Sequence, residues 1–283
     1  MASYRTYQAK ADATRAKELA ATTSPFTIDV RFVGGLTATQ RTAFTKAADR
    51  WTTAIVGDLP SVSVDGEVVD DVLILAQGVA IDGPGKILGQ AGPTHLRPGS
   101  ASKAAFLTAK GIMSFDTADL EKMETNGTLN DVITHEMGHV LGIGTLWTRK
   151  GLLRGAGTSN PTFTGDGAIT EYRTIRGSGG RKRVPVENTG GPGTRDGHWR
   201  ETVFRNELMS GFIAAAGNPM SAITVASLAD LGYQVDMAAA EPYSLPDLMA
   251  LAERGALVAH AAPVDDGSVL PVIPQVLPGD ALR

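Results

Sequence analysis

The chain has 283 residues, of which 42% are hydrophobic and 20% are charged, so it is long enough for one large or two small domains with a buried core. Its 26 lysines and arginines nearly balance 30 aspartates and glutamates, and the formal charge of -4 excludes a general electrostatic attraction to nucleic acid or anionic lipid. Because there is no cysteine, disulfide scaffolds, cysteine-ligated zinc and thiol nucleophiles are excluded.

The N-terminal residues suggest neither a membrane segment nor a secretory leader. No stretch of the chain approaches the roughly 18 uninterrupted apolar residues that a membrane-spanning helix needs. Residues 1–30 also lack the apolar run of a signal peptide. Alanine, lysine, glutamate and arginine are frequent over residues 9–21, which favours a surface helix, so we interpret residues 1–25 as an N-terminal arm.

The first strong patterns predict a strand followed by a long helix. Residues 26–33 alternate apolar and polar side chains and are rich in β-branched and aromatic residues, as strands are. Between Thr37 and Ile55 apolar residues recur every three or four positions. This spacing predicts an amphipathic helix of about five turns with Thr37 as its N-cap.

Three more strands are expected in the next part of the chain. Residues 72–76 are continuously apolar, which is typical of a strand covered on both faces. Residues 86–97 and 111–115 are weaker candidates. The first of these contains Gly92-Pro93, and we expect it at the edge of the sheet because proline cannot donate a hydrogen bond to a neighbouring strand.

Two helices follow, and the second carries the most informative sequence of the chain. A short polar helix is predicted over residues 119–124. A second helix begins near Thr128, continues through residues 132–141 and ends at Gly142. Residues 134–142 read Thr-His-Glu-Met-Gly-His-Val-Leu-Gly.

On this helix two histidines lie one turn apart, opposite an apolar stripe. Residues four apart have Cβ atoms about 5 to 6 Å apart, so the imidazoles of His135 and His139 can reach one zinc ion. Glu136 lies beside them, where a carboxylate can act on a metal-activated water without becoming a ligand. The alternative is a solvent-facing helix with two ordinary histidines, which the strong apolar stripe disfavours.

After Gly142 the sequence becomes less regular. Residues 144–197 are polar and rich in glycine, and they are predicted to form a loop-dominated insertion. Helices are predicted over residues 221–231 and 248–258. The remaining residues to Arg283 are broken by prolines and are interpreted as a tail.

Two imidazoles do not complete a catalytic zinc site, which normally has three protein ligands. Residues 135–139 have the form HExxH. In the compact zinc-binding motif HExxHxxGxxH the third histidine would stand at position 145, which is Thr145 here. The other histidines are His95, His198 and His260. From the residues alone the third ligand could be one of these, or a downstream carboxylate such as Glu171.

Three short segments together resemble the leishmanolysin-like zinc metallopeptidases of the metzincin clan, in a small bacterial form. They occur in the order expected for that family and read HEMGHVLG over residues 135–142, GHWRE over 197–201 and NELMSG over 206–211. A looser likeness extends from residue 26 to about residue 235. The combination of the three segments is far more specific than any one of them.

The resemblance implies an α+β metzincin-like fold in two lobes. The upper lobe, residues 26–142, would contain a twisted mixed sheet, two long helices and the zinc-binding histidine pair. The lower lobe, residues 143–245, would be irregular, with loops and helices that carry the third ligand and a Met-turn. Residues 246–283 would form a C-terminal helix and tail.

The resemblance also implies a zinc metalloendopeptidase. His135, His139 and His198 would bind one Zn²⁺, Glu136 would be the general base, and Met209 would be the Met-turn residue below the metal. The substrate would be a protein or peptide, hydrolysed by a metal-activated water. The family further implies a secreted enzyme, expected here as a monomer with no nucleic-acid partner and no membrane anchor.

Other interpretations remain open at this stage. The chain could be a non-catalytic zinc-binding or adhesive module on a peptidase scaffold, or a zincin with a carboxylate as third ligand. His95 lies on the expected edge strand, where it could contact a substrate that pairs with that strand. Asp166 and Asp196 lie in glycine-rich turns and could contribute to a calcium site, although their spacing matches no EF-hand.

Overall fold

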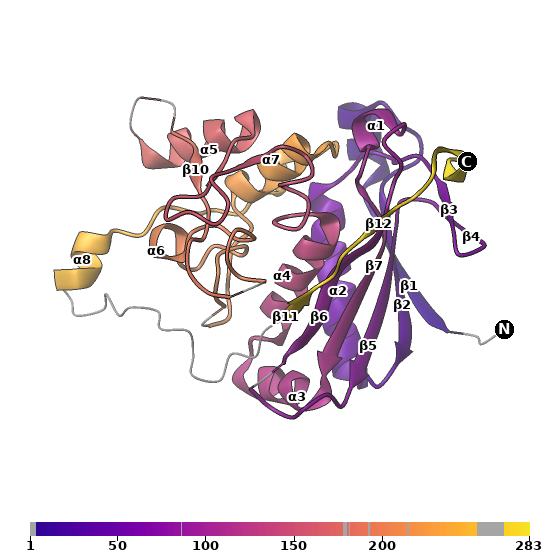
Figure 1. Ribbon diagram of the computed structural model, residues 1–283, viewed down its shortest axis with the longest axis horizontal. Helices are drawn as coiled ribbons and strands as arrows, with labels where there is room; N and C mark the ends of the chain where they lie inside the picture. The colour runs from indigo at the N-terminus through magenta and orange to yellow at the C-terminus, as the bar shows by residue number, and fades with distance from the viewer. Residues whose placement is uncertain are drawn as a thin grey trace.

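The computed structural model describes residues 4–85, 87–177, 180, 182–191, 193–213, 215–253 and 269–283. Within these residues, strands and long helices dominate the chain up to residue 142, which we call the sheet region (Figure 1). Short elements joined by loops dominate residues 143–245, which we call the loop region. The predicted α+β class with a mixed sheet is confirmed.

One mixed sheet forms the centre of the sheet region. Its strand order is β1–β2–β5–β7–β6, and both β11 and β12 pair with the outer edge of β6. β2, β5 and β7 run parallel, whereas β1 and β6 run antiparallel to their neighbours β2 and β7. The strands of this sheet are β1 (Arg5–Lys10), β2 (Thr27–Gly34), β5 (Val72–Val79), β6 (Gly89–Leu96), β7 (Thr108–Asp116), β11 (Val269–Pro271) and β12 (Gln275–Val276).

Two long helices pack side by side on one face of this sheet, as the sequence predicted. α2 (Ala38–Ala54) begins with a capping box, because Thr37 and Gln40 each accept a hydrogen bond from the other's backbone N–H. α4 (Leu129–Leu141) contacts α2, β6 and β7. The indole Nε1 of Trp51 on α2 donates to the carbonyl of Thr134 at 2.9 Å, which fixes α4 against α2. α3 (Thr117–Asn126) precedes α4.

The opposite face of the sheet carries a smaller apolar cluster. A hairpin of β3 (Val62–Val64) and β4 (Glu67–Val69) packs there with the 3-10 turn η3 (Gly279–Ala281). Leu73 of β5 is buried in this cluster with Leu277 and Ala281, whereas Ile74 is buried in the main core on the other face. The prediction that β5 is covered on both faces is therefore confirmed.

The interpretation of the N-terminus as an arm is wrong. β1 pairs with β2 along its whole length and forms an edge of the sheet, and α1 (Ala13–Ala20) follows it. Only Ala9 of β1 is fully buried, so the strand shows little apolar alternation in its sequence. The predicted surface helix corresponds to α1, in which Ala16 is buried and the other residues are exposed or half-buried.

The loop region has more regular structure than the sequence predicted. A small sheet forms from β8 (Leu153–Arg154), β9 (Thr162–Phe163) and β10 (Val184–Pro185). An unpredicted helix, α5 (Asp166–Arg176), packs against α7 (Ala222–Leu231), which was predicted. The carboxylate of Asp230 on α7 accepts hydrogen bonds from the first free N–H groups of α5, at Gly167 and Ala168. This cap comes from a distant residue, so the local sequence gives no start signal for α5.

Short elements complete the description of the chain. They are the 3-10 turns η1 (Ser102–Ala104) and η2 (Met237–Ala239), and the helices α6 (Glu201–Phe204) and α8 (Leu248–Glu253). The predicted C-terminal helix corresponds to α8 at its start, and residues 254–258 of that prediction lie outside the described residues, as does His260.

Two predictions about the outer edge of the sheet are wrong. β6 forms a strand as expected, but it does not lie at the edge, because β11 and β12 pair with it. These two strands belong to the segment interpreted as a tail. Pro271 and Pro274 limit each strand to two or three residues, which is too short to produce a strand pattern in the sequence.

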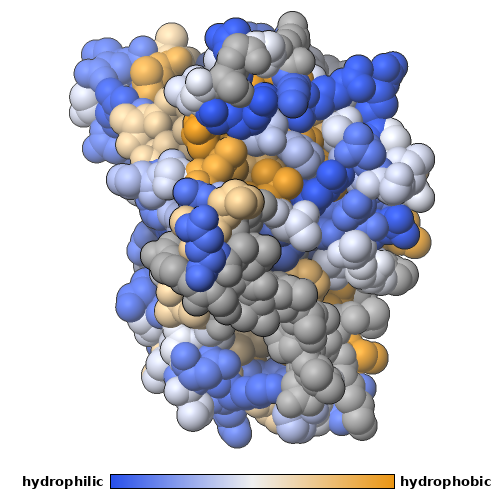
Figure 2. Space-filling view, turned by 90° about the vertical axis from the view of Figure 1, so that its left-hand side faces the viewer, coloured by the Kyte–Doolittle hydropathy of each residue, from blue (hydrophilic) through white to orange (hydrophobic). Residues whose placement is uncertain are grey.

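None of the described helices is long and apolar enough to cross a bilayer. On the face shown in Figure 2, toward the loop region, most of the coloured residues are hydrophilic and the hydrophobic ones form small groups among them. Such scattered exposed apolar side chains are ordinary for a folded protein surface.

Candidate metal centre

The two histidines of α4 lie where the sheet region meets the loop region. Ile133, Met137 and Val140 are fully buried on the side of α4 that faces the core. His135 and His139 project from the other side, toward the loop region, and are also almost completely buried. The loop region therefore covers the face of α4 that the sequence left polar.

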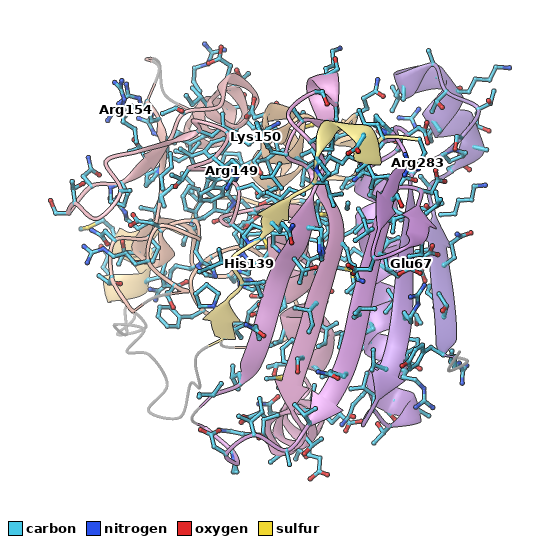
Figure 3. The ribbon with its side chains drawn as sticks, turned by 45° about the vertical axis from the view of Figure 1, so that its right-hand side comes forward. Glu67, His139, Arg149, Lys150, Arg154 and Arg283 are labelled. Carbon is cyan, nitrogen blue, oxygen red and sulfur yellow. The ribbon has the colours of Figure 1, made fainter. Side chains whose placement is uncertain are left out.

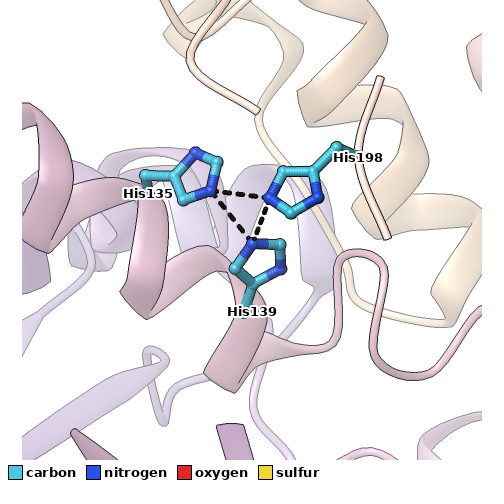
Figure 4. Close-up of side chains that lie close together, drawn as sticks. All are labelled: His135, His139 and His198. Atoms are coloured by element: carbon cyan, nitrogen blue, oxygen red, sulfur yellow. Dashed lines mark hydrogen bonds between the residues drawn. The ribbon is translucent and has the colours of Figure 1, made fainter. Parts of the chain in front are cut away.

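His198 of the loop region completes a group of three imidazoles (Figure 4). The Nε2 atoms of His135 and His139 lie 3.0 Å apart, and the Nε2 of His198 lies 3.0 Å from the first and 2.9 Å from the second. Glu171, the carboxylate considered as an alternative, is not part of this group. The structure thus brings together residues that are 59 and 63 positions apart in the chain.

Backbone carbonyls fix the orientation of all three rings. The Nδ1 of His135 donates to Leu208 O at 2.7 Å, that of His139 to Ile143 O at 2.8 Å, and that of His198 to Thr194 O at 2.8 Å. A carbonyl only accepts, so each Nδ1 carries the proton and each Nε2 presents its lone pair. Three lone pairs within about 3 Å repel one another unless a cation lies among them. The donor set fits a divalent metal such as zinc.

The imidazoles are also in the protonation state that a metal requires. Burial lowers the pKa of His135 to about 3 and that of His139 to about 4. Burial and the neighbouring histidines lower the pKa of His198 well below its usual value. All three rings are therefore neutral at pH 7, and a metal ion does not have to displace protons from them.

Glu136 lies in the same cavity as the three imidazoles. Residues His135, Glu136, His139 and His198 line a cavity of about 710 Å³. Burial raises the pKa of Glu136 to about 8, and its Oε2 has no hydrogen-bond partner among the described residues. Apolar side chains from both regions and from β11 form much of the remaining wall: Leu88, Ala91, Met123, Val132, Leu153, Phe212, Ile213 and Val269.

Met209 packs directly beneath the histidine helix. It is completely buried, and a Cβ atom added to Gly138 would lie 2.8 Å from its Sδ and 2.9 Å from Cζ2 of Trp51. Glycine at position 138 therefore allows Met209 and Trp51 to approach α4 between its two histidines. This contact sets the distance between α4 and the turn at residues 207–210.

A buried carboxylate, Glu207, holds that turn. Its side chain is 0% exposed and accepts hydrogen bonds from the backbone N–H of Met209 at 2.6 Å and of Ser221 at 3.1 Å. It also accepts from the hydroxyls of Ser221 and Thr224. Thr224 in turn accepts from the indole of Trp199, the neighbour of His198. Glu207 thus links the Leu208 carbonyl that orients His135 to the segment that carries His198.

A second buried carboxylate, Glu187, organises the loop around His198. Its side chain accepts from the backbone N–H groups of Asn188, Thr189 and Glu201. Its own backbone N–H donates to His198 O at 2.9 Å. Glu187 therefore holds His198 through its backbone and the segment that follows His198 through its side chain.

The remaining predicted site residues do not join the group of three histidines, although Asp196 lines the same cavity. His95 on β6 is paired with Gln275 of β12, contacts Thr94 through Nδ1 and is not among the residues that line the cavity. Neither Asp166 nor Asp196 belongs to a cluster of three or more potential metal ligands among the described residues. Sequence reasoning did not assign roles to Glu187 and Glu207, because their burial depends on tertiary contacts. Glu207 lies in the segment 206–211 that carries the resemblance, and Glu187 lies only in the wider stretch of looser likeness.

Comparison with known proteins identifies the family. The family model described as leishmanolysin matches residues 103–247, just over half of the chain, and this stretch includes the three histidines, Glu136 and Met209. The chain belongs to the leishmanolysin family. This is a family of zinc metallopeptidases, which act on proteins or peptides.

Two members of the family illustrate how distant the likeness is. Leishmanolysin of Leishmania donovani is 28% identical over 141 residues, which cover 47% of this chain and 23% of that protein. A leishmanolysin homolog of Crithidia fasciculata is 29% identical over 108 residues, which cover 36% of this chain and 16% of the homolog. Each match therefore spans less than a quarter of the relative's length.

Proposed function

We propose that this chain is a zinc-dependent endopeptidase. In this proposal His135, His139 and His198 bind one Zn²⁺, Glu136 is the general base, and Met209 is the Met-turn residue beneath the metal. The observation that carries the proposal is the convergence of three neutral imidazole nitrogens beside a carboxylate in one cavity.

The chemistry follows from the roles of these side chains. When bound, zinc supplies a Lewis acid that polarises the scissile carbonyl and acidifies water. A cation held by the three imidazoles would favour the ionised form of Glu136. The carboxylate would then take a proton from the attacking water as the new C–O bond forms, and pass that proton to the leaving nitrogen as the C–N bond breaks. The carbonyls of Leu208, Ile143 and Thr194 keep the three imidazoles in the ligating tautomer throughout.

The wider arrangement is part of the same proposal. Residues 26–142 form the upper lobe and residues 143–245 the lower lobe of a metzincin-like catalytic domain, with the substrate bound between them. The cavity supports this arrangement because both regions contribute to its wall. We further propose, from the family resemblance, that the enzyme acts outside the cell as a monomer on protein or peptide substrates.

Metal analysis combined with peptide cleavage tests the proposal. Wild type should bind one zinc per chain and cleave an unstructured protein such as casein, and a chelator should abolish cleavage. Glu136→Gln should keep its zinc and lose activity by about 10²- to 10⁴-fold. Zinc bound without any cleavage by wild type would instead identify a non-catalytic zinc module.

A second variant tests the third ligand. His198→Ala should lose tight zinc binding and activity together, because only two imidazoles remain. Retention of zinc and activity by this variant would show that a carboxylate, and not His198, completes the site.

A further inference from the structure

The segment from Val269 to Val276 occupies the outer edge of β6. β11 pairs in parallel with Gly89, Gln90 and Ala91, and β12 pairs in parallel with His95 and Leu96. The other edge of β6 is already taken by β7. In Figure 3 this segment, drawn in yellow, follows the edge of the sheet on the side where His139 is labelled. It lies outside the stretch that matches the family model.

This segment also forms part of the cavity that holds the three histidines. Val269 and Pro271 line that cavity together with Ala91 of β6 and the residues of the metal centre. On the other side, a Cβ atom added to Gly193 would lie 2.7 Å from the carbonyl oxygen of Val269. β11 therefore lies between β6 and the loop that leads to His198.

An extended peptide that enters this cavity would need the same backbone groups. Peptides commonly bind a sheet by adding a strand to its free edge, with main-chain hydrogen bonds that do not depend on sequence. Beside the metal centre, that edge is formed by Gly89–Ala91, and β11 already pairs with it. A substrate and β11 cannot occupy this edge at the same time.

We propose that residues 269–271 are an autoinhibitory strand that competes with the extended substrate for the edge of β6. This proposal rests on the proposed peptidase function, because it assigns the edge of β6 to the substrate backbone. When β11 is displaced, the edge of β6 is accessible to the substrate. When β11 is paired with this edge, the substrate cannot bind there.

The contacts of the segment show which part is firmly attached. Leu277 and Ala281 are buried in the apolar cluster on the opposite face of the sheet, and Leu277 N donates to Leu96 O at 2.9 Å. Arg283 N donates to Ser61 O at 2.9 Å. Residues 277–283 therefore anchor the segment, whichever state β11 adopts.

β11 itself is held much more weakly. It pairs over three residues only, Pro271 has no N–H to donate, and Ile273 just after it is 94% exposed. A short strand of this kind opens locally at a small free-energy cost. Because it is tethered to its anchor, its effective concentration at the edge is about millimolar, so even weak pairing competes with a dilute substrate.

Peptide binding in an inactive background tests the proposal. The parent protein is zinc-loaded Glu136→Gln, and the probe is a fluorescein-labelled ten-residue peptide with leucine at its centre, followed by fluorescence anisotropy. Adding Val269→Gly and Pro271→Gly should weaken β11 and tighten peptide binding about tenfold. The matched control is Ile273→Gly, which alters an exposed residue of the same segment and should leave the affinity unchanged.

Hydrogen exchange provides a second readout that needs no catalysis. The backbone amides of residues 89–91 should exchange faster in the double glycine variant than in the parent, and saturating peptide should restore their protection. Equal peptide affinity in the two proteins, weaker binding by the variant, or no binding to either would overturn the proposal. Weaker binding would mean that β11 belongs to the substrate site.

The active enzyme separates this proposal from the proposed function. With Glu136 present, the double glycine variant should show a KM about tenfold lower and an unchanged kcat. If zinc-loaded wild type and variant both fail to cleave any peptide, the peptidase function is wrong, while the anisotropy and exchange measurements still decide whether β11 blocks the edge. If both cleave with the same KM, the peptidase function stands and the autoinhibitory strand is wrong.

Discussion

The sheet region and the loop region contribute histidines to one site but hold them by different means. In the sheet region, the spacing of His135 and His139 is set by one helical turn, and α4 is fixed by apolar packing on α2, β6 and β7. In the loop region, His198 belongs to no helix or strand. It is held by backbone contacts and by the buried carboxylates of Glu187 and Glu207.

This difference shows how far the position of each histidine depends on distant parts of the chain. The geometry of one helix alone brings the imidazoles of His135 and His139 to the same side of α4, because these residues are four positions apart. The third reaches them only if a network of buried hydrogen bonds forms correctly. Damage to the loop region should therefore reduce zinc affinity and stability together, whereas damage to the sheet region away from α4 should reduce stability alone.

The largest effect is expected from Glu207→Leu. This change leaves the N–H groups of Met209 and Ser221 and two hydroxyls without their acceptor in a buried place, which should lower the free energy of unfolding by about 3 to 5 kcal/mol. The apparent Kd for zinc should rise about 10- to 100-fold, because the turn that orients His135 loses its support. Denaturant titration and competition with a chromophoric chelator measure the two effects.

Glu121→Leu is the matched control, since Glu121 is exposed on α3. It should change stability by less than about 0.5 kcal/mol and leave zinc binding as it is. Similar behaviour of the two variants would contradict the assigned role of Glu207.

A smaller but still large effect is expected just after α4, where two segments of the loop region touch backbone to backbone. A Cβ atom at Gly144 would overlap the carbonyl oxygen of Gly197, next to His198. Gly144→Ala should therefore push the His198 segment away from α4, with a loss of about 2 to 3 kcal/mol in stability and weaker zinc binding.

Gly151→Ala separates this clash from backbone strain. Gly144 and Gly151 have φ values of 75° and 69°, but a Cβ at Gly151 meets no atom within 4 Å. Gly151→Ala should cost only about 1 kcal/mol, the strain of a left-handed alanine. Equal losses in the two variants would show that the close approach of Gly144 and Gly197 is not important.

The buried acid of α4 should make stability depend on pH. Burial raises the pKa of Glu136 from 4.5 to about 8, so between these values the folded chain holds a proton that the unfolded chain releases. The free energy of unfolding therefore falls as pH rises from 4.5 to 8, and Glu136→Gln avoids this loss.

In protein treated with a chelator, Glu136→Gln should be more stable than wild type by about 2 kcal/mol at pH 8 and show no such advantage at pH 4.5. The lowered pKa values of the histidines have the opposite sign, since they reduce stability as pH falls below 6.5, but they are present in both proteins. Thermal unfolding over this pH range measures the difference. A constant difference would show that Glu136 is not desolvated.

The smallest effect is expected in the sheet region, far from the metal. Thr37→Ala removes the side-chain half of the capping box of α2 and should cost about 1 kcal/mol. Zinc affinity should not change, because α2 still packs on α4 through Trp51. A loss of zinc affinity, measured by chelator competition, would contradict the expectation that changes in the sheet region away from α4 affect stability alone.

The same contrast explains what could be predicted from the sequence. Strands β2 and β5 and helices α2, α4 and α7 have strong local patterns, and their predictions are confirmed. β11 and β12 could not be predicted, because two or three residues between prolines form a strand only when β6 offers an edge. α5 was missed because Asp230, a distant residue, caps its start.

In the candidate site, too, some residues could be predicted from local spacing and others depend on tertiary contacts. The histidine pair and Glu136 follow from a spacing of four on one helix. The involvement of His198 rested on resemblance, and the roles of Glu187 and Glu207 depend on tertiary contacts that no spacing in the sequence records. Conversely, the edge position expected for His95 was wrong, because the chain covers that edge with its own residues.

X-ray absorption at the zinc edge tests the central claim most directly. Zinc-loaded wild type should show three imidazole nitrogens at about 2.0 to 2.1 Å, and His198→Ala should show at most two with a lower occupancy. A wild-type spectrum with only two imidazoles, or an unchanged spectrum in His198→Ala, would contradict the three-histidine centre on which the proposed function depends.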